Sequence, residues 1–154
     1  MNSEVHFDQV LAFLDGPDSP DISNPIHSTA GAASYGFKGA LVGGATVFGW
    51  TTPLILEKLG TEWLRNGWAS ISFRRPTYPN EALTISLEEA GPREFLLKVN
   101  GPDGNARLQG EIGIGKAPWF DKIIGTEASE AVITQPKLPT LTLSTAPISK
   151  ALLP

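Results

Sequence analysis

Four segments in the second half of the chain alternate between apolar and polar side chains, and this alternation constrains the fold more than any other feature. The segments cover residues 68–73, 83–88, 95–100 and 106–114. Proline, glycine and asparagine residues typical of turns separate them. A period of two places successive side chains on opposite faces of a strand. The pattern predicts an antiparallel meander with one face exposed to water.

One long helix is predicted ahead of these strands. The segment from Ala45 to Leu59 carries apolar side chains around nearly its whole circumference, so we expect it to be buried. Pro53 lies inside it and removes one backbone hydrogen bond, which predicts a kink, and Gly60 fits the position just after its end. A shorter helix is predicted over residues 27–35, with Gly36 after it.

A buried helix followed by an antiparallel sheet is an α+β layer arrangement. A long central helix wrapped by a curved antiparallel sheet is the hotdog arrangement, and we expect a single domain of this kind over residues 1–116. The apolar residues between Val5 and Leu14 fit a strand that runs into a short helix, and their periodicity does not decide. Residues 117–154 are rich in Pro, Thr and Ser, which predicts an extended or partly disordered C-terminal extension.

The composition excludes several function classes. The chain has 154 residues and a net charge of −4 without a basic cluster, which argues against nucleic acid and anionic membranes as partners. It has no cysteine and only two histidines, His6 and His27, so we expect no disulfide and no metal site. We find no signal-peptide pattern and no convincing membrane span, and we therefore expect a cytoplasmic protein.

Residues able to carry chemistry gather just before the long helix. His27 follows Asp21 by a short stretch of loop, and Gly43 and Gly44 open the helix. An imidazole base, a carboxylate and a helix N-terminus that can hold developing negative charge are the parts needed for chemistry next to a carbonyl.

Each of these residues also has a structural interpretation. His27 would then cap the loop before the Ala-rich helix, Asp21 would belong to ordinary turn chemistry, and the glycine pair would allow tight packing of the helix end. We favour function for His27 and leave both interpretations open for Asp21. Ser23, Ser28 and Thr29 are expected to cap a helix, and Arg74 and Arg75 to be solvated at the surface.

Several short motifs resemble one enzyme family. Asn24-Pro25-Ile26-His27, then Gly36-Phe37, Gly43-Gly44 and Phe73-Arg74-Arg75-Pro76, are similar to the MaoC-like (R)-specific enoyl-CoA hydratases, over residues 20–115. The resemblance implies a hotdog fold, a homodimer, no cofactor, and a lyase that hydrates an α,β-unsaturated acyl thioester or dehydrates its product. It implies a small-molecule acyl substrate, linked to coenzyme A or to a carrier.

The resemblance also implies roles for individual residues. His27 would act as the base and proton carrier, and Asp21 would help to hold the water. The backbone N–H of Gly44 would polarise the carbonyl, and Asn24 and Gly43 would complete the substrate-binding part of the site.

The chain departs from the family pattern at several points. Thr29 stands where the family has an acidic residue, and the stretch between His27 and Gly36 is one residue shorter than in the family. Ile22 stands where the family has its aspartate, and Gly43 stands where it has the histidine that opens the helix. Two alternatives to hydration therefore stay open. One is a cofactor-free isomerase or cyclase that uses His27 alone, and the other is a non-catalytic protein that binds acyl chains or serves as a structural partner subunit.

Overall fold

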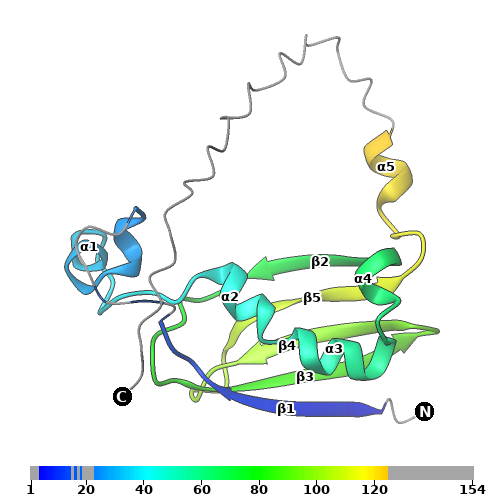
Figure 1. Ribbon diagram of the computed structural model, residues 1–154, viewed down its shortest axis with the longest axis horizontal. Helices are drawn as coiled ribbons and strands as arrows, with labels where there is room; N and C mark the ends of the chain where they lie inside the picture. The colour runs from blue at the N-terminus through cyan, green and yellow to red at the C-terminus, as the bar shows by residue number, and fades with distance from the viewer. Residues whose placement is uncertain (1–3, 15, 17, 19–22, 125–154) are drawn as a thin grey trace, which may run out of the picture.

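A five-stranded antiparallel sheet with helices on one face forms the body of the protein (Figure 1). The computed structural model describes residues 4–14, 16, 18 and 23–124. The strands are β1 (Val5–Leu11), β2 (Gly67–Phe73), β3 (Ala82–Gly91), β4 (Glu94–Asn100) and β5 (Ala106–Ile114). Their order in the sheet is β1-β3-β4-β5-β2, with antiparallel pairing throughout.

The four predicted strands are confirmed, but their connection is not a simple meander. β3, β4 and β5 do follow one another across the sheet. β2, however, pairs with β5, with Gly67 opposite Ile114 and Phe73 opposite Leu108. The chain between Phe73 and Ala82 must therefore cross over to reach β3. Alternation defines the two faces of a strand and says nothing of its neighbour, so the sequence could not predict this crossover.

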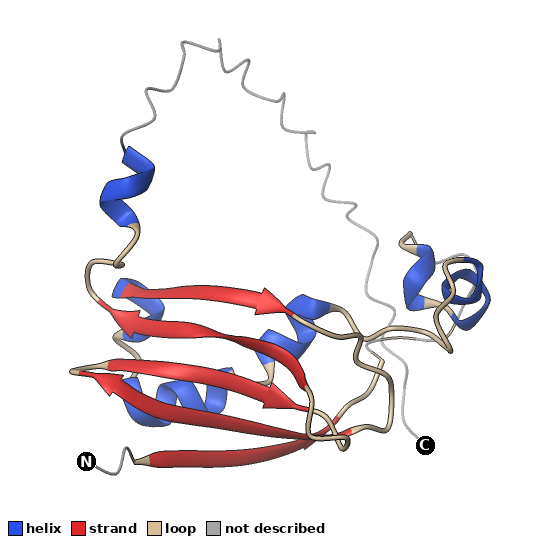
Figure 2. Ribbon diagram, turned by 180° about the vertical axis from the view of Figure 1, so that it is seen from behind, coloured by secondary structure: helices blue, strands red, loops and turns tan. Residues whose placement is uncertain are grey.

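The helices are short and lie on one side of the sheet or beyond its end. They are η1 (a 3-10 helix, Pro25–His27), α1 (Thr29–Ser34), α2 (Gly44–Gly49), α3 (Thr52–Leu59), α4 (Trp63–Asn66) and α5 (Phe120–Ile124). In Figure 2 the open face of the sheet is toward the viewer, α2, α3 and α4 lie behind it, and α1 lies beyond its end. The segment of uncertain type near the N-terminus is the edge strand β1.

The predicted central helix is interrupted between α2 and α3. Pro53 has no N–H to donate to the carbonyl of Gly49, so the regular helical bond is missing there. The N–H of Thr51 donates instead to the carbonyl of Phe48, at 3.0 Å, and tightens the turn before the proline. The predicted kink thus separates α2 from α3, and Trp50 and Thr51 between them keep right-handed helical dihedral angles. Gly60 follows Leu59 with φ +70°, as the sequence predicted.

The core lies between the helices and the inner face of the sheet. Its buried members include Val47, Leu54, Ile55 and Leu59 from the helices and Leu83, Ile85, Leu87, Leu97, Val99, Leu108 and Ile112 from the strands. The opposite face carries exposed polar residues, among them Ser70, Ser72, Lys98, Gln109 and Glu111. Each large buried side chain contributes about 1.5–3 kcal/mol, so this one-sided core holds the helices on the sheet.

The predicted C-terminal extension begins inside the described part. Ala117 is buried and α5 follows it, so residues 117–124 are not extended as predicted. The prediction for residues 125–154 lies outside the described residues. Among the described helices, none has the length and apolar character needed to cross a membrane.

A substitution at Gly110 provides a test of how β2 packs against β5. A Cβ at this position would lie 2.1 Å from the carbonyl oxygen of Ser70 and 2.9 Å from Cα of Ile71, which are backbone atoms. We expect Gly110→Ala to lower the free energy of unfolding by about 1–3 kcal/mol, measured by urea denaturation. Gly49→Ala is the matched control, because a Cβ there meets nothing within 4 Å. Equal urea midpoints for the two variants would contradict the assigned register.

Candidate functional site

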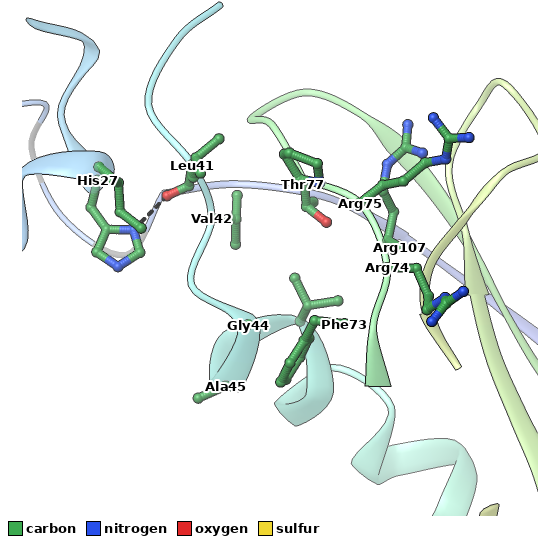
Figure 3. Close-up of a pocket in the computed structure, with 13 residues that line it drawn as sticks. His27, Leu41, Val42, Gly44, Ala45, Phe73, Arg74, Arg75, Thr77 and Arg107 are labelled. Carbon is green, nitrogen blue, oxygen red and sulfur yellow. Dashed lines mark hydrogen bonds between the residues drawn. The ribbon is translucent and has the colours of Figure 1, made fainter. Parts of the chain in front are cut away.

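A pocket of about 510 Å³ opens where the start of α2, the end of β2 and the loop after β2 meet (Figure 3). Ile26, Leu41, Val42, Val47 and Phe73 supply apolar surface to its lining. His27 lies at one side of the view, and Arg74, Arg75 and Arg107 lie at the other. The pocket therefore combines an apolar wall with one imidazole and a group of cations.

The hydrogen bonds of His27 define which nitrogen carries its proton. Nδ1 lies 2.7 Å from the carbonyl oxygen of Leu41, and Nε2 lies 3.3 Å from the amide nitrogen of Asn24. A carbonyl oxygen only accepts, so Nδ1 must be the donor in the neutral imidazole. Nε2 then keeps its lone pair and accepts from the Asn24 amide. The basic atom of this half-buried side chain is therefore Nε2.

The local sequence holds His27 in place through two linked turns. Pro25 begins η1, and the N–H of His27 donates to the carbonyl of Asn24 at 3.1 Å. The buried hydroxyl of Ser28 donates to the carbonyl of Pro25 at 3.0 Å and accepts from the N–H of Gly31 at 3.1 Å. The predicted role of Ser28 as a helix cap is confirmed, because this hydroxyl caps α1.

The glycine pair lies between His27 and Phe73. A Cβ at Gly43 would lie 3.7 Å from Cε1 and 4.0 Å from Nε2 of His27, so this glycine borders the imidazole. A Cβ at Gly44 would lie 2.8–3.0 Å from the ring of Phe73. The absence of a side chain at Gly44 thus lets this ring lie on the start of α2 (Figure 3).

The structure brings together four of the five residues that the sequence singled out. Asn24 and Gly43 each adjoin His27, and Gly44 lines the same pocket as His27. Asp21 lies outside the described residues. No carboxylate is among the described residues that line the pocket.

Nearby charges are held by specific partners. The guanidinium of Arg107 donates to Glu81, with Nε–Oε2 at 3.0 Å and Nη2–Oε1 at 3.3 Å, and Nη1 lies 3.0 Å from Oδ1 of Asp103. The hydrogen bonds to Glu81 are the main cause of a raised pKa for Arg107. A hydrogen bond from Asn105, assisted by Arg107, lowers the pKa of Asp103 to about 2. The positive charge of Arg107 is thus neutralised.

Arg74 and Arg75 have a different environment. Both are exposed, and neither forms an ion pair within the described part of the chain. They supply uncompensated positive charge beside the pocket. The sequence identified both as surface residues. It missed Arg107 and the Leu41 carbonyl, because neither belongs to a local pattern and each reaches its partner across a long sequence separation.

One group of side chains outside the pocket has the composition of a cation site. Ligand atoms of Glu4, His6 and Glu89 lie within 4.8 Å of one another near β1. Exposed acidic groups of this kind are common without an ion, and nothing links the group to the pocket.

Comparison with known proteins identifies the fold. The sequence matches no protein-family profile and no curated protein. An (R)-hydratase from A. caviae involved in PHA biosynthesis has a TM-score of 0.56 and 17% identity, covering 74% of this chain and 96% of that chain. R-hydratase PhaJ1 from Pseudomonas aeruginosa gives a TM-score of 0.53 and 20% identity, covering 76% and 83%. A MaoC-like dehydratase from Phytophthora capsici gives 0.58 and 16%, covering 77% and 42%.

At these identities the similarity establishes the fold alone. The chain has the hotdog fold of these hydratases and dehydratases, which confirms the predicted fold class.

The Leu41 contact predicts the tautomer of neutral His27. We expect the proton on Nδ1, because the Leu41 oxygen lies 2.7 Å away and can only accept. The measurement is ¹⁵N NMR of the imidazole at alkaline pH, in a His6→Gln background that leaves a single histidine. A predominant Nε2–H form would contradict the assignment of Nε2 as the basic atom.

Proposed function

We propose that this protein is a MaoC-like hydratase or dehydratase that acts on an α,β-unsaturated acyl thioester or a related carbonyl compound. The observation that carries this proposal is the basic Nε2 of His27 beside a pocket with an apolar wall. The shared fold with (R)-hydratases and a MaoC-like dehydratase supports it.

The proton path follows from the tautomer. In the hydration direction, Nε2 of His27 takes a proton from water while the water oxygen bonds to the β-carbon of the enoyl group. The electron pair of the double bond moves toward the thioester carbonyl, and the imidazolium then returns the proton to the α-carbon. Asn24, which donates to Nε2 in the structure, gives way to the water in this step. Dehydration is the reverse sequence.

The other site residues have supporting roles in the proposal. Asp21 helps to hold the water, and the backbone N–H of Gly44 polarises the thioester carbonyl. Phe73 covers Gly44 but is 58% exposed, so its ring is free to turn away when the substrate enters. Gly43 leaves space beside the imidazole for the reacting carbons.

The charge beside the pocket fits a thioester carrier. The exposed Arg74 and Arg75 lie across the pocket from His27 and offer guanidinium groups to phosphates of coenzyme A or of a carrier-bound arm (Figure 3). We further propose that the protein works as a cytoplasmic homodimer. Pairing between copies would cover one of the two free edges, β1 or β2, that the described sheet presents.

One observation favours a second candidate. His27 is the only general base among the described residues that line the pocket. A single base that removes and returns a proton is sufficient for an isomerisation, or for a cyclisation by conjugate addition, and such an enzyme needs no water-holding carboxylate.

Crotonyl-CoA separates these candidates. We expect the wild type to deplete the enoyl absorbance, and His27→Ala to lower kcat/KM by about 10²–10⁴-fold through loss of the base. His6→Ala is the matched control, because His6 lies on β1 and does not line the pocket.

Equal rates for wild type and His27→Ala would contradict the role of His27. No depletion by any of the three proteins would set hydration aside and favour the isomerase. If His27→Ala also bound crotonyl-CoA as tightly as an inert wild type, a non-catalytic acyl-binding role would stand.

A further inference from the structure

One arginine holds both ends of the crossover loop, which we define as residues 74–81, between β2 and β3. At the start of the loop, the N–H of Arg74 donates to the carbonyl oxygen of Arg107 at 2.8 Å. At its end, the carboxylate of Glu81 accepts two hydrogen bonds from the guanidinium of the same Arg107, at 3.0 and 3.3 Å. Both ends of the loop are therefore hydrogen-bonded to one residue of β5, Arg107.

The ion pair between Arg107 and Glu81 is largely buried and has a specific geometry. The side chain of Arg107 is 6% exposed and that of Glu81 is 12% exposed. The guanidinium also donates to the carbonyl of Asn105 at 3.2 Å, and Gly101 leaves the space that it fills, since a Cβ there would overlap it. A buried carboxylate bound at two points by a guanidinium fork tolerates little displacement.

The middle of the crossover loop is bonded to the segment that holds His27. The N–H of Val42 donates to the carbonyl of Thr77 at 2.9 Å. The neighbouring carbonyl of Leu41 accepts from Nδ1 of His27 at 2.7 Å. Figure 3 shows this arrangement, with Thr77 and Val42 between the arginines and His27. The segment that carries the Leu41 oxygen is thus bonded to the crossover loop through Val42 and to the turn before His27 through the N–H of Leu41, which donates to the carbonyl of Ile26 at 2.9 Å.

We propose that the Glu81–Arg107 ion pair positions His27 for proton transfer through the crossover loop and the Leu41 carbonyl. When the pair is lost, the loop shifts, the Leu41 oxygen moves, and the proton of the neutral imidazole is no longer held on Nδ1. Imidazole with its proton on Nε2 has no lone pair there and is no base at that atom. The proposal deepens the proposed function, because it rests on the assignment of His27 as the base.

The test is the tautomer of His27 in variants of the ion pair. In the His6→Gln background, Glu81→Gln keeps the shape of the side chain and removes its charge. We expect the Nε2–H fraction, measured by ¹⁵N NMR at alkaline pH, to rise at least twofold over the parent. Glu62→Gln is the matched control: it removes the exposed ion pair with Arg93, whose atoms lie 2.6 Å apart, and we expect no change.

A second variant disturbs the same ion pair between Arg107 and Glu81 without removing a charge. Gly101→Ala places a methyl group within 2.2 Å of Nη2 of Arg107 and forces the guanidinium aside. We expect the same rise in the Nε2–H fraction. This variant decides the matter if Glu81→Gln does not fold.

A purely structural ion pair would change stability and leave the tautomer unchanged. A folded Glu81→Gln or Gly101→Ala protein with the parental ¹⁵N shifts would therefore overturn the proposal. The readout needs no turnover, so it is separable from the proposed activity. If the wild type is inert but the Nε2–H fraction rises in the variants, the hydratase proposal is refuted and the positioning role is kept. If the wild type is active but the Nε2–H fraction does not change in the variants, the positioning role is refuted and the hydratase proposal is kept.

Discussion

The chemistry of the pocket depends on one hydrogen bond, from Nδ1 of His27 to the carbonyl oxygen of Leu41. Because that oxygen can only accept, it fixes the proton on Nδ1 and leaves the lone pair on Nε2. In this tautomer Nε2 accepts from the Asn24 amide nitrogen, which lies 3.3 Å away. Without the Leu41 contact, neither ring nitrogen of His27 would be fixed as the one that takes a proton. The site therefore combines one oriented base with an apolar wall and nearby cations, which is a small set of parts for acid–base chemistry beside a carbonyl.

The fold makes this hydrogen bond possible by bringing together segments that are far apart in the sequence. β2 pairs with β5, so the chain has to cross over to β3, and the crossover loop forms part of the pocket wall. Arg107 on β5 holds both ends of that loop, and Thr77 in its middle holds the segment that contains Leu41. α2 begins at Gly44, which lines the pocket. The one-sided core keeps these helices against the sheet.

Much of the fold could be predicted from the sequence, because the relevant signals are local. Alternation located the four strands, Gly60 marked the end of α3, and the hydroxyl of Ser28 capped α1 as expected. The pairing of β2 with β5 was not accessible, since it is decided by packing between segments far apart in the chain. The residues of the site differ in the same way, because some belong to a local motif and others act across long sequence separations. His27 and Asn24 stand out in a short motif, whereas the Leu41 carbonyl and the Glu81–Arg107 pair act across separations of 14 and 26 residues. The role of Asp21 stays a prediction, because that residue lies outside the described chain.

The central claim is that His27 moves a proton between water and the carbon next to a thioester. Its most direct test is turnover of crotonyl-CoA in D₂O, with the product analysed by mass spectrometry for wild type and His27→Ala. The account predicts a product that has gained the elements of water and one non-exchangeable deuterium on the α-carbon, formed by the wild type and not by the variant. A labelled product without added water would replace the hydratase with an isomerase. Identical labelling by both proteins would contradict the claim that His27 is the base, and no labelling by either would set hydration aside.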